Sequence, residues 1–231
     1  MPRFSPALLL LVAPLAILAG CERLQSFEKA CATRLAPPTV EVTTEPVRYS
    51  TDLSRSIQDL TTRESHPWGR EVSGLVTAEL KSEVSVTARG LADRSGARHC
   101  LRPDATVRLA FDPMVMYIAR EQRPGSCAHL VTLEHERKHV RVYDQYLVDV
   151  RDDLRTQILG KLGDRPLVFA SEQEADAAVR KLLEETLAPF VRAAIQEVLD
   201  LQKMVDSERE YARLDLEQAK CSLAEPAPPR R

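Results

Sequence analysis

His135 and His139 are the residues of this sequence with the clearest potential for chemistry. They stand four positions apart, and Glu136 directly follows the first of them. Positions i and i+4 of an α-helix share one face and are separated by roughly 6 Å of rise, so both imidazoles can reach one metal ion. This spacing is typical of a catalytic zinc site, in which the glutamate acts on a water molecule at the metal. The sequence therefore predicts His135 and His139 as zinc ligands and Glu136 as a general base.

The histidine pattern works only on a helix, and the sequence predicts one over residues 126–160. Ser126 follows a Pro-Gly turn and can cap the first turn. Apolar residues then recur at helical spacing as far as Ile158, and glycines end the pattern. The pair is therefore expected in the third turn of a long amphipathic helix.

The rest of the chain indicates the fold around this helix. Apolar and polar residues alternate in several short runs within residues 39–123, which predicts strands joined by turns. A second long helix is predicted over residues 171–219, because Ser171 and Glu174 match a capping box. We expect an α+β fold, with a small antiparallel sheet followed by two long C-terminal helices packed as a hairpin.

A catalytic zinc ion needs a third protein ligand. If the two helices run antiparallel from the turn near Gly163, residues around 190–200 lie beside His139, which favours Glu197 or Asp200. Glu174 already has a role in the cap. The second helix offers further acidic candidates, namely Glu184, Glu185 and Glu208.

Arg137 and Lys138, between the two histidines, argue against an ordinary protease helix. Helices that carry a catalytic zinc are buried, and these two charges require one side of the helix to reach solvent. One alternative is a non-enzymatic envelope lipoprotein that acts as a scaffold or binding module. Another is a zinc ion with a purely structural role, held by four protein ligands.

The N-terminal residues 1–20 are predicted to be a lipoprotein signal peptide. Arg3 precedes an apolar segment, Leu8 to Leu18, that is too short to span a membrane. The segment ends in Leu-Ala-Gly-Cys and resembles the lipobox of bacterial lipoproteins. This resemblance implies acylation of Cys21 and a lipid anchor in a membrane. Glu22, in place of aspartate, implies the outer membrane, with the protein facing the periplasm.

The four other cysteines fit such an exported protein. Cys31, Cys100, Cys127 and Cys221 are an even number and suggest two disulfides in an oxidising compartment. Three connectivities are open. We favour Cys100–Cys127, which would join a strand end to the histidine helix, with Cys31–Cys221 joining the two ends of the domain.

Composition indicates one domain with ordinary surface properties. Residues 21–38 are polar and proline-ended and are predicted to be a tether, residues 39–222 a single domain, and residues 223–231 a disordered tail. A net charge of −2 provides no strong field for nucleic acid, so no nucleic-acid partner is expected. The expected partners are a membrane and a protein or peptide substrate in the envelope.

The order of these features resembles a family of uncharacterised bacterial secreted or lipoprotein domains that are predicted zinc-dependent proteases. The likeness rests on Val47-Arg48-Tyr49-Ser50, on Cys100 and Cys127, on Val115-Met116-Tyr117-Ile118-Ala119, and on the histidine motif. It implies a zinc-dependent peptidase. Relatives carry a Tyr-Asp-x-x-Thr-x-His-Gly stretch near the end, and here Glu217 stands where the histidine would be. If that histidine is the third ligand, Glu217 substitutes for it.

Overall fold

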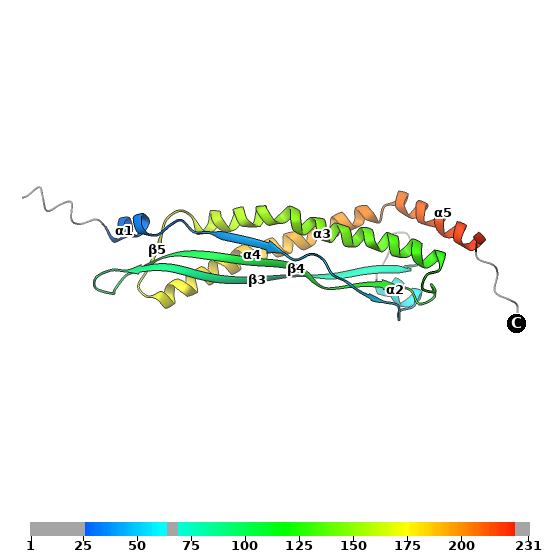
Figure 1. The fold of residues 1–231 in the computed structure, drawn as a ribbon, viewed down its shortest axis with the longest axis horizontal. Coiled ribbons are helices and arrows are strands. Elements are labelled where there is room, and N and C mark those ends of the chain that lie inside the picture. The colour runs from blue at the N-terminus through cyan, green and yellow to red at the C-terminus, as the bar shows by residue number, and fades with distance from the viewer. Residues whose placement is uncertain (1–25, 64–68, 225–231) are drawn as a thin grey trace, which may run out of the picture.

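The computed structural model describes residues 26–63 and 69–224. The predicted signal peptide and Cys21 therefore lie outside the described residues, as do residues 225–231 of the predicted tail. The segment predicted as a tether contains a helix, α1 (Phe27–Arg34), whose first turn is capped by Ser26. The molecule is elongated, with α1 near one end and the last helix at the other (Figure 1).

A long hairpin of two strands forms the largest part of the sheet. β3 (Gly74–Ala92) and β4 (His99–Ile118) pair antiparallel along almost their whole length. Asp93 closes the turn between them by accepting hydrogen bonds from the backbone of Ser95 and Ala97. A strand of twenty residues spans about 60 Å. The runs that the sequence divides into short strands are therefore segments of two very long ones.

The prediction of a small antiparallel sheet is wrong. Short strands β1 (Val40–Thr44) and β2 (Ser50–Asp52) pair parallel with β4, and β5 (Leu167–Phe169) pairs antiparallel with it. The result is a mixed five-stranded sheet with β4 at its centre. Alternation of apolar residues shows which side of a strand is buried but carries no information on pairing direction, so the sequence pattern could not reveal the parallel pairs.

The helical part contains three helices where two were predicted. After the short α2 (Ile57–Arg63), the chain forms α3 (Cys127–Leu162), α4 (Glu172–Val205) and α5 (Glu208–Ala224). The predicted starts are confirmed, since the Ser126 and Ser171 side chains accept backbone hydrogen bonds at the first turns of α3 and α4. The predicted second helix is interrupted after Val205, which separates α5 from α4.

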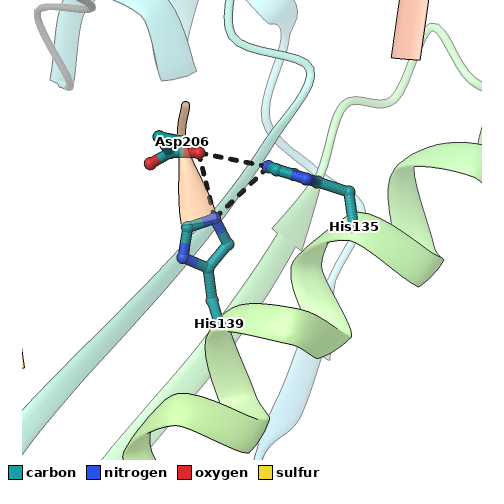
Figure 2. Close-up of side chains that lie close together, drawn as sticks. All are labelled: His135, His139 and Asp206. Carbon is teal, nitrogen blue, oxygen red and sulfur yellow. Dashed lines mark hydrogen bonds and ion pairs between the residues drawn. The ribbon is translucent and has the colours of Figure 1, made fainter. Parts of the chain in front are cut away.

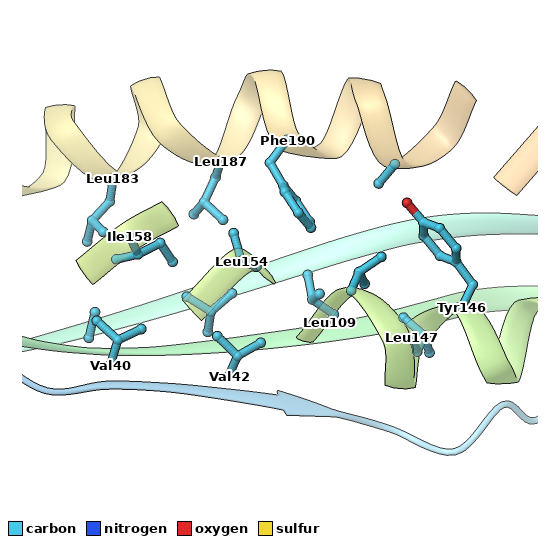
Figure 3. Packing of buried hydrophobic residues seen from close by; sticks show 14 of the residues in the cluster. Val40, Val42, Leu109, Tyr146, Leu147, Leu154, Ile158, Leu183, Leu187 and Phe190 are labelled. Carbon is cyan, nitrogen blue, oxygen red and sulfur yellow. The ribbon is translucent and has the colours of Figure 1, made fainter. Parts of the chain in front are cut away.

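The core lies between the sheet and the two longest helices (Figure 3). Alternate residues of β4, such as Val107 and Leu109, are fully buried against α3. Leu154 and Ile158 of α3 occupy the centre, and α4 covers them from the other side with a stripe that includes Leu183, Leu187 and Phe190. Burying side chains of this size contributes roughly 1.5–3 kcal/mol each. This layer holds α3 in a fixed position, and the histidines are on α3.

Two disulfides join parts of the chain that are distant in sequence, but not in the favoured connectivity. Cys31 bonds to Cys100 and Cys127 bonds to Cys221. The predicted Cys100–Cys127 bond is excluded because β4 runs its full length between them, which places the two cysteines near opposite ends of the molecule. The Cys127–Cys221 bond instead fastens α5 to the first turn of α3.

Candidate functional site

The histidine motif lies on α3 as predicted, with its side chains turned inward. His135, Glu136 and His139 are 5%, 3% and 8% exposed. The two histidine rings are in edge-to-face contact, with their Nε2 atoms 3.3 Å apart. The helical spacing thus brings both imidazoles to one point.

Asp206 completes this point from a different helix. It is the C-cap residue of α4, and its Oδ1 lies 3.2 Å from His135 Nε2 and 3.2 Å from His139 Nε2. Figure 2 shows the three side chains converging, two from α3 and one from the end of α4. Two nitrogens and one carboxylate oxygen therefore form a compact triangle that could hold a metal ion.

The size of this triangle fits zinc. Three ligand atoms around a tetrahedral zinc ion, each at roughly 2.0–2.2 Å, lie about 3.3 Å from one another. The observed separations are 3.2, 3.2 and 3.3 Å. Two imidazoles and one carboxylate are also a common set of protein ligands for catalytic zinc, with a fourth position left for water or substrate.

The second nitrogen of each ring is held in a way that favours metal binding. Nδ1 of His139 lies 2.6 Å from Gln202 Oε1, and the Gln202 amide nitrogen donates to the backbone carbonyl of His139. Nδ1 of His135 lies 3.3 Å from Glu210 Oε1. Donation from both Nδ1–H groups leaves the Nε2 lone pairs directed at the triangle, as in metal sites whose histidines are oriented by neighbouring acceptors.

Three electron-rich atoms at such short range require a cation between them, either a metal ion or a proton. The pKa values of His139 and Asp206 reflect this. Burial alone would lower the pKa of His139, but the hydrogen bond to Asp206 and the charges of Glu136 and Asp206 outweigh it and raise the pKa to about 9. Burial opposes ionisation of Asp206, yet its hydrogen bonds to His135 and His139 hold its pKa well below the usual range. In the absence of metal, a proton on His139 supplies the missing positive charge.

The free energy of unfolding of the metal-free protein should therefore fall as the pH rises from about 6.5 to about 9. In this window the folded state keeps the His139 proton that the unfolded state has lost, so the stabilisation is complete below the window and disappears above it. The expected slope is at most about 1.4 kcal/mol per pH unit. Urea unfolding in a chelator at several pH values measures it, and His139→Gln serves as the comparison. An equal slope in both proteins would contradict this assignment.

The third-ligand candidates drawn from the sequence do not lie at the triangle. Glu197 accepts a hydrogen bond from Tyr146, which is two helical turns along α3 from His139. Asp200 is exposed and pairs with Lys203, and Glu217 pairs with Arg213. The remaining candidates are exposed on α4 or at the start of α5, namely Glu174, Glu184, Glu185 and Glu208.

Asp206 was missed because the second helix was expected to continue past it. Gln202 lies opposite His139, seven residues beyond the middle of the predicted range of 190–200. The cause is the start of α4, whose first turns extend beyond the end of α3 and shift the pairing of the two helices. Ser207 and Glu210 have the spacing of a capping box, and the Glu210 backbone N–H donates to Ser207 Oγ. That signal marks a helix start and would have indicated Asp206 as the end of the preceding helix.

A cavity of about 150 Å³ opens beside the triangle. His135, Glu136, His139, Asp206 and Tyr211 line one side of it, and consecutive residues from Glu71 to Val76 line the other. The cavity thus follows the start of β3. In the described part of the chain, β3 pairs with β4 and with no other strand.

Gly74 is a part of this site that sequence reasoning did not identify. A Cβ atom at this position would lie 2.3 Å from Glu136 Oε1 and 2.6 Å from Thr132 Cγ2. Such distances are shorter than any van der Waals contact, so only glycine leaves room for the Glu136 carboxylate in its place.

For the zinc-dependent peptidase that the sequence predicts, Gly74→Ala should displace Glu136 and lower the activity by about a hundredfold without loss of zinc, since a shift of about 1 Å in a reacting group can cost that much. Turnover and zinc content of the same preparation measure the two effects. Gly90→Ala is the matched control, because its Cβ would meet Leu101 at 2.5 Å far along the same strand. Similar losses in both variants would indicate a general folding defect instead.

The two charged residues inside the motif take different positions on α3. Arg137 is exposed, while Lys138 is partly buried and pairs with Glu210 of α5. The expectation that one side of this helix reaches solvent is confirmed. Both charges are therefore compatible with a buried pair of histidines, since Arg137 faces solvent and Lys138 is paired with a carboxylate.

No known protein family, curated protein or solved structure matches this chain.

Proposed function

We propose that this protein is a zinc-dependent peptidase of the bacterial envelope, anchored in a membrane through a lipid on Cys21. The observation that carries the proposal is the triangle of His135, His139 and Asp206, whose dimensions suit tetrahedral zinc, with Glu136 lining the same cavity. The two disulfides fit a protein folded in an oxidising compartment.

The residues around the triangle have complementary roles in hydrolysis of an amide bond. His135, His139 and Asp206 would hold the zinc ion, which would supply Lewis-acid chemistry toward the scissile carbonyl and toward a water molecule. Glu136 would accept a proton from the attacking water as the water oxygen bonds to the carbonyl carbon, and would deliver that proton to the amine as the C–N bond breaks. Tyr211 donates a hydrogen bond to Asp206 at 2.9 Å, and burial raises the pKa of its hydroxyl, so it stays protonated.

The edge of β3 that pairs with no strand among the described residues supports a peptide as the substrate class. An extended peptide can add to the edge of a sheet through main-chain hydrogen bonds. The start of β3 and the three residues before it, Glu71–Val76, line the cavity. A peptide bound along this stretch would therefore pass Glu136 and the triangle. This arrangement favours cleavage within extended, unfolded segments.

Metal removal tests the proposed activity. Purified protein should cleave an unfolded protein such as reduced and alkylated casein, and a chelator should lower the rate at least about a hundredfold, since the Lewis acid contributes several kcal/mol to the transition state. Added zinc should restore the rate. Cleavage that is insensitive to chelator would refute a metallopeptidase, and tight zinc binding without cleavage would favour the structural metal of a non-enzymatic lipoprotein.

A further inference from the structure

Glu210 is the meeting point of three side chains beside the candidate metal site. Its Oε1 lies 3.3 Å from His135 Nδ1, 2.5 Å from Lys138 Nζ and 2.6 Å from Arg213 Nη2. Arg213 also donates from Nε to Oε2 at 3.0 Å. The Glu210 carboxylate is 15% exposed, so these charge-assisted hydrogen bonds are only weakly screened by solvent.

The two cations on Glu210 come from different helices. Arg213 lies on α5, three residues after Glu210, and fixes the carboxylate relative to its own helix. Lys138 lies on α3, three residues after His135, so the two side chains share a face and reach the same oxygen. Lys138 therefore ties Glu210 to the helix that bears the histidine.

We propose that Lys138 is a positioning residue for the metal site, which binds Glu210 across the contact of α3 and α5 and thereby keeps the His135 ring directed at the metal. The proposal rests on the zinc site proposed above. It gives a role to a residue of the motif that, by sequence, argued against a protease.

A positioning role and a simple charge effect have opposite consequences for zinc affinity. Removing a positive charge near a divalent cation lowers the electrostatic repulsion and should strengthen zinc binding. Loss of the Lys138–Glu210 contact frees the carboxylate and the His135 ring, which should weaken zinc binding. Loss of a group that orients a ligand typically weakens metal affinity by 10–100-fold.

The test compares zinc dissociation constants of the full-length protein and its variants, measured by competition with a chromophoric chelator. Lys138→Met should weaken zinc binding about tenfold, the lower end of the range for orienting groups. Lys138→Arg should restore most of the affinity, since it keeps a cation within reach of Glu210. Arg137→Met is the matched control, because Arg137 is the exposed neighbour on the same helix, and it should leave zinc affinity unchanged.

A double-mutant cycle tests whether Lys138 affects zinc affinity through Glu210. In a Glu210→Gln background, Lys138→Met should no longer weaken zinc binding. Equal losses in both backgrounds, or tighter zinc binding in Lys138→Met alone, would overturn the positioning role and leave the zinc site standing. A wild-type protein that binds no zinc would refute the proposed function itself. Thermal unfolding of each variant checks that the comparison is made between folded proteins.

Discussion

Asp206→Asn is expected to weaken zinc binding by more than about a hundredfold. The substitution keeps the size of the side chain but removes the anionic ligand that completes the triangle with His135 and His139. Loss of an orienting group alone costs 10–100-fold in metal affinity, and the loss of a ligand should exceed this. Competition with a chromophoric chelator at fixed pH measures the change.

Asp200→Asn is the control for this substitution. Asp200 lies on the same helix but is exposed and pairs with Lys203. We expect its zinc affinity to equal that of the wild type. Similar affinities in the two variants would show that Asp206 is not a ligand, and would return attention to other acidic residues.

Glu136→Gln should lower kcat for peptide cleavage by about 10²–10⁴, the usual contribution of a general base, while zinc remains bound. Glutamine occupies the same space beside Gly74 but cannot accept the proton of the attacking water. Steady-state kinetics on the unfolded substrate, together with the zinc content of the same preparation, separate chemistry from metal loss.

The matched control is Glu134→Gln, because Glu134 lies on the solvent side of the same helix and pairs with Arg141. Its activity should equal that of the wild type. Full activity in Glu136→Gln would remove the general base from the mechanism. Wild-type protein that never cleaves peptides would favour the binding-module alternative.

The local features of the helices could be predicted from the sequence because they depend on near neighbours. Ser126 and Ser171 begin α3 and α4 as expected, and Gly163 ends α3 with a positive φ of 65°. The shared face of His135 and His139 follows from helical spacing alone. The sheet could not be predicted in the same way, because its parallel pairs and the length of β4 depend on contacts between distant segments.

The third ligand shows the same limit within the site. Its place depends on how far α4 extends past the end of α3, which is a property of the assembled hairpin. The start of α4 extends about seven residues beyond the end of α3, which shifts the residues of α4 opposite His139 by about two helical turns. Gln202 and Asp206 therefore lie beside His139, where Asp200 was expected. The local signal was nevertheless present in the Ser207–Glu210 capping box, since a new helix start implies that the residue before it leaves helical geometry.

Anomalous diffraction at the zinc edge, on crystals of the wild-type protein grown with stoichiometric zinc, tests the zinc site most directly. We predict one strong peak about 2 Å from His135 Nε2, His139 Nε2 and Asp206 Oδ1, with an open position toward Glu136. The absence of a peak at this triangle, or a zinc ion bound elsewhere by other side chains, would contradict the site and the activity proposed from it.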